Sequence, residues 1–526
     1  MIKKKRYTII LSLILIFEAA FLLLIPVLCS NLVDKAILYT KGENINLVLE
    51  TLLLLIPGIG LVIMKTLYNF LYSSFSLKLE KEYKEYLYIN LINKKYNEIR
   101  NYSTGKIELL FNQDIFNVIK NQLTTIPQFI RELSRMLFAI IIVAFIDYKY
   151  LILILIFGVI GFIFAKIYSS KSRKLHRKVL DKDGKVSGFI IETNAQLKLI
   201  QAYDSKEYVN EHFLKLNDDL IDSKRKRNYL IYGANSGLYA FTTILYLFTI
   251  CYGALSITVG LTYGNVLALI QLLSNIQNPF LSFSSLINSY NLSKTSLTRL
   301  NEALAMNENE KPLIIDDFES IIFDNVSFSY DNENKILDNF SMEIKKNDIV
   351  LLSGPSGRGK TTILMLLLGF IEPNSGSIYL VSNNEKIKLD SKTRSIFGYV
   401  PQENIIFSGT ILDNIYILTG KSKDEAIKAL KLANIYDEIM ALPNGLETEL
   451  KERGSGLSLG QIQRILIAIA LLKDSKILLL DEFSSALDSN NEDIIINNLK
   501  NLNKTIIYVT HRNKTIDNKR IVSLEE

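Results

Sequence analysis

The sequence predicts a chain of two unlike parts, an all-α membrane domain of six spans followed by an α/β domain. The long uncharged or nearly uncharged runs all fall before residue 290, although apolar residues make up only 48% of the 526-residue chain. From residue 321 onward, short β-rich runs alternate with helical stretches, which is typical of an α/β domain. The length also favours more than one domain.

Six apolar segments in the first part each approach the roughly 20 residues that a helix needs to cross a bilayer. A buried helix of a soluble protein is the alternative for any one of them, but six would need an implausibly large dry core. We therefore expect a membrane domain over 1–305, a linker over 306–320 and a second domain over 321–526. The expected spans lie near 8–30, 46–70, 125–146, 149–169, 234–256 and 263–285.

Basic residues predict the orientation of these spans. Lysines and an arginine at 3–6 precede the first span, and segments 78–120 and 171–227 are rich in Lys and Arg, whereas the opposite connections carry few basic residues. We expect a multi-pass protein of the cytoplasmic (plasma) membrane with both termini cytoplasmic. The Ile-, Lys- and Asn-rich composition suggests a bacterial source. Membrane lipid is an expected partner; nucleic acid is not, because the positive-inside bias explains the basic runs.

A glycine-rich turn follows the first clear strand of the second domain, in "DIVLLSGPSGRGKTTILMLLLGF". Its pattern is G-x-x-x-x-G-K-T, in which backbone N–H groups wrap a polyphosphate that a Cβ would hold away. Lys360 can reach the β- and γ-phosphates, and the Thr361 hydroxyl can bind Mg²⁺. The expected ATP-binding residues here are Gly354, Pro355, Ser356, Gly357, Arg358, Gly359, Lys360, Thr361 and Thr362.

Two carboxylates end the apolar run of "SKILLLDEFSSALDS". The run predicts a buried parallel strand that presents Asp481 and Glu482 at its carboxyl end, where such sheets bind ligands. Asp481 would hold hydrated Mg²⁺, and Glu482 would orient and polarise the attacking water. A plain pair of charges at a strand end is the alternative when this stretch is taken alone.

Together these features resemble an ABC exporter half-transporter, in which six spans are fused to one P-loop ATP-binding domain. The resemblance implies that Tyr330 of "VSFSY" stacks on adenine, and that His511 of "YVTHR" contacts the γ-phosphate. Gln402 of "YVPQ" would couple nucleotide to the membrane domain and join Thr361 and Asp481 as a Mg²⁺ ligand. The loop that links two ATP sites across a dimer would comprise Ser485, Ala486, Leu487 and Asp488.

The signature segment of that family, L-S-G-G-Q, appears here as "LSLGQ". Ser458 and Gln461 have the spacing of a capping box at a helix start. By resemblance, Ser458, Leu459, Gly460 and Gln461 would face the ATP held by a partner chain. Leu459 departs from the pattern, and its side chain would crowd the closest backbone approach to that ATP. Either a homodimer tolerates it, which we favour, or the chain pairs with a different half-transporter.

The resemblance implies a transport ATPase that uses ATP and Mg²⁺ to export a substrate by alternating access. Coupling would run through short helices near 97–107 and 202–213, with contacts in 395–420. A peptide, a lipid or a drug-like compound is the expected cargo, with Glu18, Arg131 and Arg135 as substrate candidates, although an interhelical pair explains these charges equally well. The alternative function is an ATP-binding regulatory partner in a heterodimer with one non-hydrolysing site.

Overall fold

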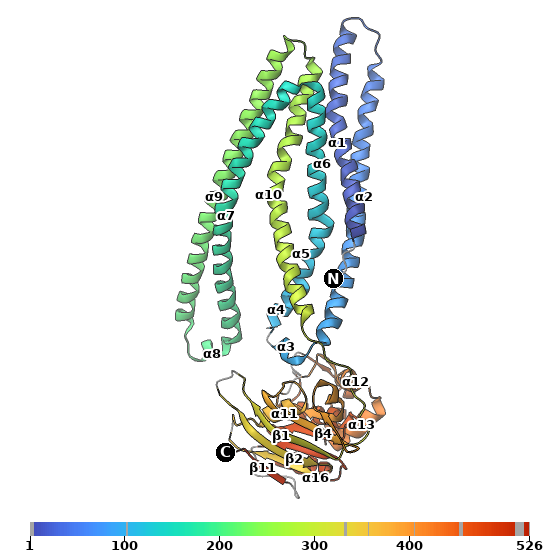
Figure 1. Ribbon diagram of the computed structural model, residues 1–526, viewed down its shortest axis with the longest axis vertical. Helices are drawn as coiled ribbons and strands as arrows, with labels where there is room; N and C mark the ends of the chain where they lie inside the picture. The colour runs from blue at the N-terminus through green and yellow to red at the C-terminus, as the bar shows by residue number, and fades with distance from the viewer. Residues whose placement is uncertain are drawn as a thin grey trace. The chain divides into compact units, whose positions relative to one another are not determined.

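The computed structural model describes residues 5–100, 102, 104–330, 334–355, 357–403, 406–451, 456–510 and 520–524. The chain forms two compact units, drawn in Figure 1. The first comprises Met1–Tyr88 and Thr104–Leu304. The second comprises Ala305–Glu526 together with a short stretch of the N-terminal half, Ile89–Ser103.

Long helices build the first unit, and each expected span falls within one of them to within one residue. Asp147 separates two of these helices: it ends one and caps the next, because its carboxylate accepts from the backbone N–H groups of Lys149 and Tyr150. The long helices are α1 (Lys5–Thr40), α2 (Leu47–Ile92), α6 (Ile126–Ile146), α7 (Tyr148–Ala195), α9 (Lys206–Ile257) and α10 (Tyr263–Ala305). The short ones are α4 (Thr104–Leu109), α5 (Ile115–Lys120) and α8 (Leu197–Ala202), with π-helical turns at Leu110–Asp114 and Asn121–Thr125. The short helix α3 (Tyr96–Arg100) belongs to the second unit.

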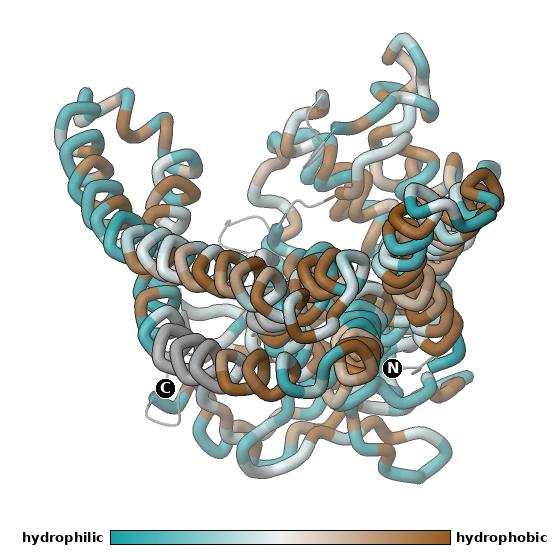
Figure 2. The backbone as a smooth tube through the Cα atoms, turned by 90° about the horizontal axis from the view of Figure 1, so that it is seen from above, coloured by the Kyte–Doolittle hydropathy of each residue, from teal (hydrophilic) through white to brown (hydrophobic). Residues whose placement is uncertain are grey.

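Three helices of the described residues, α1, α2 and α9, are long and apolar enough to cross a membrane. In α2 the apolar side chains lie on the outside: Leu52, Val62 and Phe70 are 53%, 66% and 73% exposed. Such a surface is unfavourable in water and suits contact with lipid tails. Figure 2 shows the long brown hydrophobic stretches along the helices.

The described helices of the first unit pack through buried apolar clusters, two of which join helices far apart in the sequence. A buried cluster joins α1, α6, α7, α9 and α10 through residues such as Leu23, Val143 and Leu272. A second, smaller cluster lies further along α7 and α9, where Val179, Val186 and Leu220 pack together. Figure 1 shows α7 and α9 side by side along their length.

Two main sheets organise the second unit. The parallel sheet has the strand order β11 (Arg520–Ser523), β3 (Ile349–Ser353), β10 (Thr505–Val509), β9 (Ile477–Asp481) and β6 (Phe397–Val400). The strands β9 and β10 are short apolar runs buried on both faces, as expected for the centre of a parallel sheet, whereas β11 is largely exposed. The antiparallel sheet has the order β2 (Leu337–Lys345), β1 (Ser320–Phe328), β4 (Ser375–Ser382) and β5 (Glu385–Lys388). A small ladder pairs β7 (Gly409–Thr410) with β8 (Glu449–Leu450).

The register of the parallel sheet positions the candidate site. Val509 of β10 pairs with Leu352 of β3 on one side and with Asp481 of β9 on the other. The carboxyl ends of β3 and β9 are therefore level, one strand apart. Helices around the sheet are α11 (Lys360–Leu367), α12 (Ile411–Thr419), α13 (Lys423–Leu432), α14 (Tyr436–Met440), α15 (Leu459–Leu472) and α16 (Ser489–Lys500), with 3₁₀ turns at Ser391–Ile396 and Gly445–Glu447.

Candidate active site

The glycine-rich loop connects β3 to α11 as predicted from the sequence. Gly354, Gly357 and Gly359 have φ values of +144°, +84° and +88°, which L side chains rarely adopt. A Cβ on Gly359 would also lie 2.7 Å from Cγ2 of Ile336. These glycines therefore permit a backbone path that other residues would strain. Ser356 lies outside the described residues.

Lys360 begins α11 and is buried, with only 6% of the residue exposed. Its Nζ donates to the carbonyl oxygens of Gly354 at 2.7 Å and Pro355 at 2.9 Å. The ammonium group is thus held at the N-terminus of α11, where the helix dipole favours an anion. Arg358 closes the loop through its backbone N–H, which donates to the Pro355 carbonyl. Thr362, in the first turn of α11, is buried.

Asp481 and Thr361 form the part of the site that fits a cation. Asp481 is fully buried, and its Oδ1 accepts from the Thr361 hydroxyl at 3.2 Å. Its Oδ2 is buried without a hydrogen-bond partner among the described residues. Burial raises the pKa of this carboxyl to about 6, against the lowering effect of the Thr361 hydrogen bond. An unsatisfied carboxylate oxygen beside a hydroxyl suits a hard divalent cation such as Mg²⁺.

Glu482 follows directly, and its backbone is left-handed with φ of +49°. Its N–H donates to the Val509 carbonyl at 3.1 Å, and its own carbonyl accepts from Ser485 at 3.0 Å. A non-glycine residue in this conformation costs energy and persists only where its surroundings hold it, which is common at active sites. Gln402 is exposed two residues beyond β6, the strand next to β9, and therefore lies at the same sheet edge. His511 lies outside the described residues.

The signature segment begins α15 with the capping box that its spacing predicts. The Ser458 hydroxyl accepts from Gln461 N–H at 3.2 Å, and the Gln461 side-chain oxygen accepts from Ser458 N–H at 2.9 Å. Leu459 is 62% exposed, so its side chain crowds nothing within this chain. Gly460 is the constrained position, because a Cβ there would lie 2.7 Å from the Ala486 carbonyl oxygen.

The segment Ser485–Asp488 connects β9 to α16. Leu487 is buried, and the Asp488 carboxylate caps α16 by accepting from the Asn491 N–H at 2.8 Å. Sequence reasoning missed the residue that fixes this segment, Gln463 of α15. Gln463 is fully buried; its Nε2 donates to the Glu482 carbonyl at 3.1 Å, and its Oε1 accepts from the Ala486 N–H at 3.2 Å. The sequence signal that could have revealed Gln463 is its position as a polar residue on the buried face of an otherwise apolar helix.

A second residue that the sequence did not reveal, Arg464, anchors α15 to α14. Its guanidinium is buried and pairs with both carboxylate oxygens of Glu438, at 2.7 and 2.8 Å. The hydrogen bond from Arg464 holds the pKa of the Glu438 carboxyl below its usual range. Gln461 also donates to Glu438, at 3.0 Å, so the start of α15 is tied to the same carboxylate.

Tyr330 lies just beyond β1 and is 51% exposed. The ring of Phe328 meets it almost perpendicularly, with centroids 4.9 Å apart. The guanidinium carbon of Arg100, from α3, lies over the Tyr330 ring at 5.1 Å from its centroid. The segment that carries Arg100 also contacts Phe370 and Glu372, which precede the range 395–420 that we expected.

The three substrate candidates of the membrane unit form one network of charges. Arg131 lies 3.7 Å from Glu18 and 2.8 Å from Glu132. Arg135 lies 3.6 Å from Glu132, and its Nε donates to the Asn275 side-chain oxygen at 2.7 Å. Two carboxylates and two guanidinium groups from α1 and α6 therefore offset one another.

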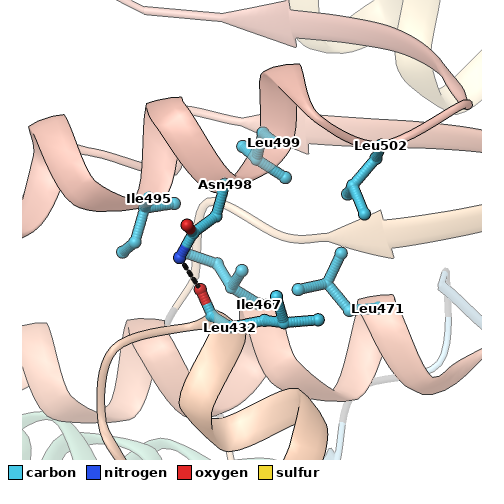
Figure 3. Close-up of a pocket in the computed structure, with 7 residues that line it drawn as sticks. All are labelled: Leu432, Ile467, Leu471, Ile495, Asn498, Leu499 and Leu502. Carbon is cyan, nitrogen blue, oxygen red and sulfur yellow. Dashed lines mark hydrogen bonds between the residues drawn. The ribbon is translucent and has the colours of Figure 1, made fainter.

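An apolar pocket in the second unit, drawn in Figure 3, is distinct from these polar residues. Its single amide, Asn498, already donates to the Leu432 carbonyl at 2.7 Å. No charged side chain lines it, so it does not suit a nucleotide phosphate. The lining residues are Leu432, Ile467, Leu471, Ile495, Asn498, Leu499 and Leu502.

Comparisons with known proteins agree with this architecture. The ABC transporter transmembrane region matches residues 8–280, and the ABC transporter domain matches 337–485. Proteins named as export ATP-binding/permease proteins are similar over 98% of this chain and 90% of their own length, with 30% identity in Rickettsia typhi (strain ATCC VR-144 / Wilmington) and 29% in Rickettsia bellii (strain RML369-C). The solved structure of a bacterial Atm1-family ABC exporter with ATP bound has the same fold, with a TM-score of 0.86 and 22% identity over 99% of this chain and 93% of that one.

The chain therefore belongs to the ABC transporter family. It is a transport ATPase of the exporter type, with membrane and ATP-binding domains fused in one polypeptide. The predicted fold class, a helical membrane domain followed by an α/β nucleotide-binding domain, is confirmed.

Proposed function

We propose that this transporter exports its substrate across the cytoplasmic membrane by alternating access, with ATP and Mg²⁺ bound between the nucleotide-binding units of a dimer. The observation that carries this proposal is the hydrogen-bonded pair of Thr361 and Asp481 beside the glycine-rich loop. A buried carboxylate oxygen of Asp481 has no partner among the described residues, and Lys360 lies close by at the N-terminus of α11. ATP would close the two units, and hydrolysis would reset them. The basic cytoplasmic segments support a multi-pass topology with both termini inside.

Each site residue has a role in this proposal. Lys360 and the loop backbone bind the phosphates, while Thr361, Gln402 and Asp481 would hold Mg²⁺, which offsets the charge that develops on the phosphates. Glu482 orients the attacking water. Tyr330 stacks on adenine, and His511 contacts the γ-phosphate. The partner's signature segment would complete the site, so one chain alone is insufficient.

The packing of α7 and α9 supports a dimer. Beyond the main cluster, the buried residues of the second cluster come from these two helices alone. Apolar side chains nearby remain open, including Ile191 at 70% and Tyr208 at 79% exposed. A second copy of the chain is the proposed partner that covers them, because exporters of this family act as dimers. A different half-transporter is the alternative, favoured by the exposed Leu459 at the start of α15.

The cargo is proposed to be polar or amphipathic, within the broad classes of peptides, lipids and drug-like compounds. The distances among Glu18, Arg131 and Glu132 support an interhelical tie as much as a cargo contact. Glu18→Gln separates the two. A cargo contact predicts altered substrate stimulation with unchanged basal ATPase; Glu50→Gln, which removes a different ion pair with Lys35, is the matched control.

ATPase activity of the purified chain in lipid nanodiscs tests the main proposal. Robust turnover that Glu482→Gln abolishes supports a self-sufficient homodimer in which Leu459 is tolerated. Negligible turnover that Leu459→Gly restores supports the heterodimer instead, with a partner chain supplying an intact signature. Turnover that survives Glu482→Gln would contradict the assigned role of Glu482.

A further inference from the structure

We propose that Arg100 competes with adenine for the ring of Tyr330, so that binding of the base releases a contact between the 89–103 segment and the nucleotide-binding unit. The inference rests on the proposed stacking of adenine on Tyr330. It adds a residue from the N-terminal half of the chain to the determinants of nucleotide affinity.

Four contacts anchor the 89–103 segment independently of Tyr330. Lys94, whose side chain is 2% exposed, pairs with Glu308 at 2.9 Å, and Lys95 pairs with Glu372 at 3.0 Å. The remaining two contacts are the Tyr96 ring, whose centroid lies 4.8 Å from that of Phe370, and the Asn307 side chain, which donates to Glu98 at 2.7 Å. The segment therefore stays docked whether or not Arg100 touches the ring.

Arg100 is the last residue of α3 and reaches beyond this anchored region. Its guanidinium carbon is 5.1 Å from the Tyr330 centroid, within the range of a cation–π contact. Among the described residues no carboxylate pairs with Arg100, and the side chain is exposed, so the aromatic ring is its described contact. The contact can therefore be lost without leaving a charge buried.

The distance between the Arg100 guanidinium and the Tyr330 ring decides whether adenine displaces Arg100 or inserts between the two groups. Stacked groups need a separation of about 3.5 Å or more, so a base inserted between Tyr330 and the guanidinium requires roughly 7 Å. The observed 5.1 Å holds one layer only. Phe328 meets the same ring almost perpendicularly. Competition follows if adenine stacks on the face of Tyr330 that Arg100 covers.

Competition has a predictable size. An exposed cation–π contact is weak, and its loss should tighten ATP binding by about two- to fivefold. By linkage, bound ATP must weaken the Arg100 contact by the same factor. The position of Arg100, at the end of α3, would thus depend on whether the base is bound, whereas the glycine-rich loop contacts only the phosphates.

Equilibrium calorimetry on the full chain in nanodiscs tests this inference, in a Glu482→Gln background that prevents turnover. The probes are MgATP and inorganic tripolyphosphate with Mg²⁺, which lacks a base. Arg100→Gln should tighten ATP about two- to fivefold and leave tripolyphosphate unchanged. Arg225→Gln, which removes another exposed arginine charge, in α9, should change neither affinity.

Three results would overturn the competition. Weaker ATP binding by Arg100→Gln would mean that Arg100 holds the base in place. Unchanged affinity for ATP would mean that Arg100 does not compete, and equal tightening of both probes would mean that Arg100 acts on the phosphates. Tyr330→Ala tests the underlying assumption separately, since it should weaken ATP but not tripolyphosphate. If it weakens neither, the proposed base site is wrong. In the Tyr330→Ala background, Arg100→Gln should have no further effect.

Discussion

Replacement of Gln463 by leucine should lower turnover without weakening ATP binding. Gln463 holds both the Glu482 carbonyl and the Ala486 N–H from within α15, and it is fully buried. Leucine has a similar volume and can make neither hydrogen bond. The change therefore removes the support of Glu482 while Lys360 and its loop keep their own contacts.

The energetic cost follows from the partners that each group retains. The part-buried Ala486 N–H loses its acceptor, which costs at most about 1–3 kcal/mol. The Glu482 carbonyl still accepts from Ser485 at 3.0 Å, so its loss is smaller, about 0.5–1.5 kcal/mol. We expect a local destabilisation of about 1.5–4.5 kcal/mol near Ser485–Asp488. Misplacement of Glu482 by about 1 Å should reduce kcat by roughly tenfold to a hundredfold.

Hydrogen exchange of the 485–488 amides, with kcat and KM for ATP, measures these effects. Gln463→Glu is the matched control: in its ionised form at high pH it keeps an acceptor for Ala486 but cannot donate to the Glu482 carbonyl, so it should recover part of the amide protection and little of kcat. A fall in protection with unchanged kcat would refute the positioning role. A rise in KM as large as the fall in kcat would place the effect at the phosphate loop.

Three further predictions concern the same unit. Gly460→Ala places a Cβ 2.7 Å from the Ala486 carbonyl oxygen and should cost about 1–3 kcal/mol, seen as faster hydrogen exchange of the α15 amides. Asp481→Asn should abolish hydrolysis yet stabilise β9 against hydrogen exchange by up to about 3 kcal/mol. The reason is that folding raises the pKa of this carboxyl from 3.8 to about 6, so its charge opposes folding above pH 6 and ceases to do so as the pH falls toward 4. Equal protection of the β9 amides in the two proteins at pH 7.5 would contradict this prediction. Glu438→Leu should cost about 2–4 kcal/mol and loosen the start of α15, because it leaves the buried Arg464 guanidinium without its carboxylate; an unchanged thermal midpoint by calorimetry would count against this estimate.

The local features of the site were predictable because short stretches of chain encode them. The glycine pattern from Gly354 to Thr361 dictates a turn that only glycines tolerate, and four apolar residues before Asp481 dictate a buried strand end. The capping box of Ser458 and Gln461 likewise depends on a spacing of three residues. In each case the interacting atoms are near neighbours along the sequence, so the residue types and their spacing suffice.

The sequence by itself determined the class of protein, the order of its two parts and the residues of its phosphate loop, since periodicity and spacing are local properties. Only the tertiary structure decided which distant groups meet. Gln463 reaches Glu482 because α15 packs on the loop after β9, and Arg100 reaches Tyr330 because 89–103 folds with the second unit. The balance of Glu18 against Arg131 also depends on how two helices pack. Such pairings are set by packing geometry between segments, which no periodicity along the chain records.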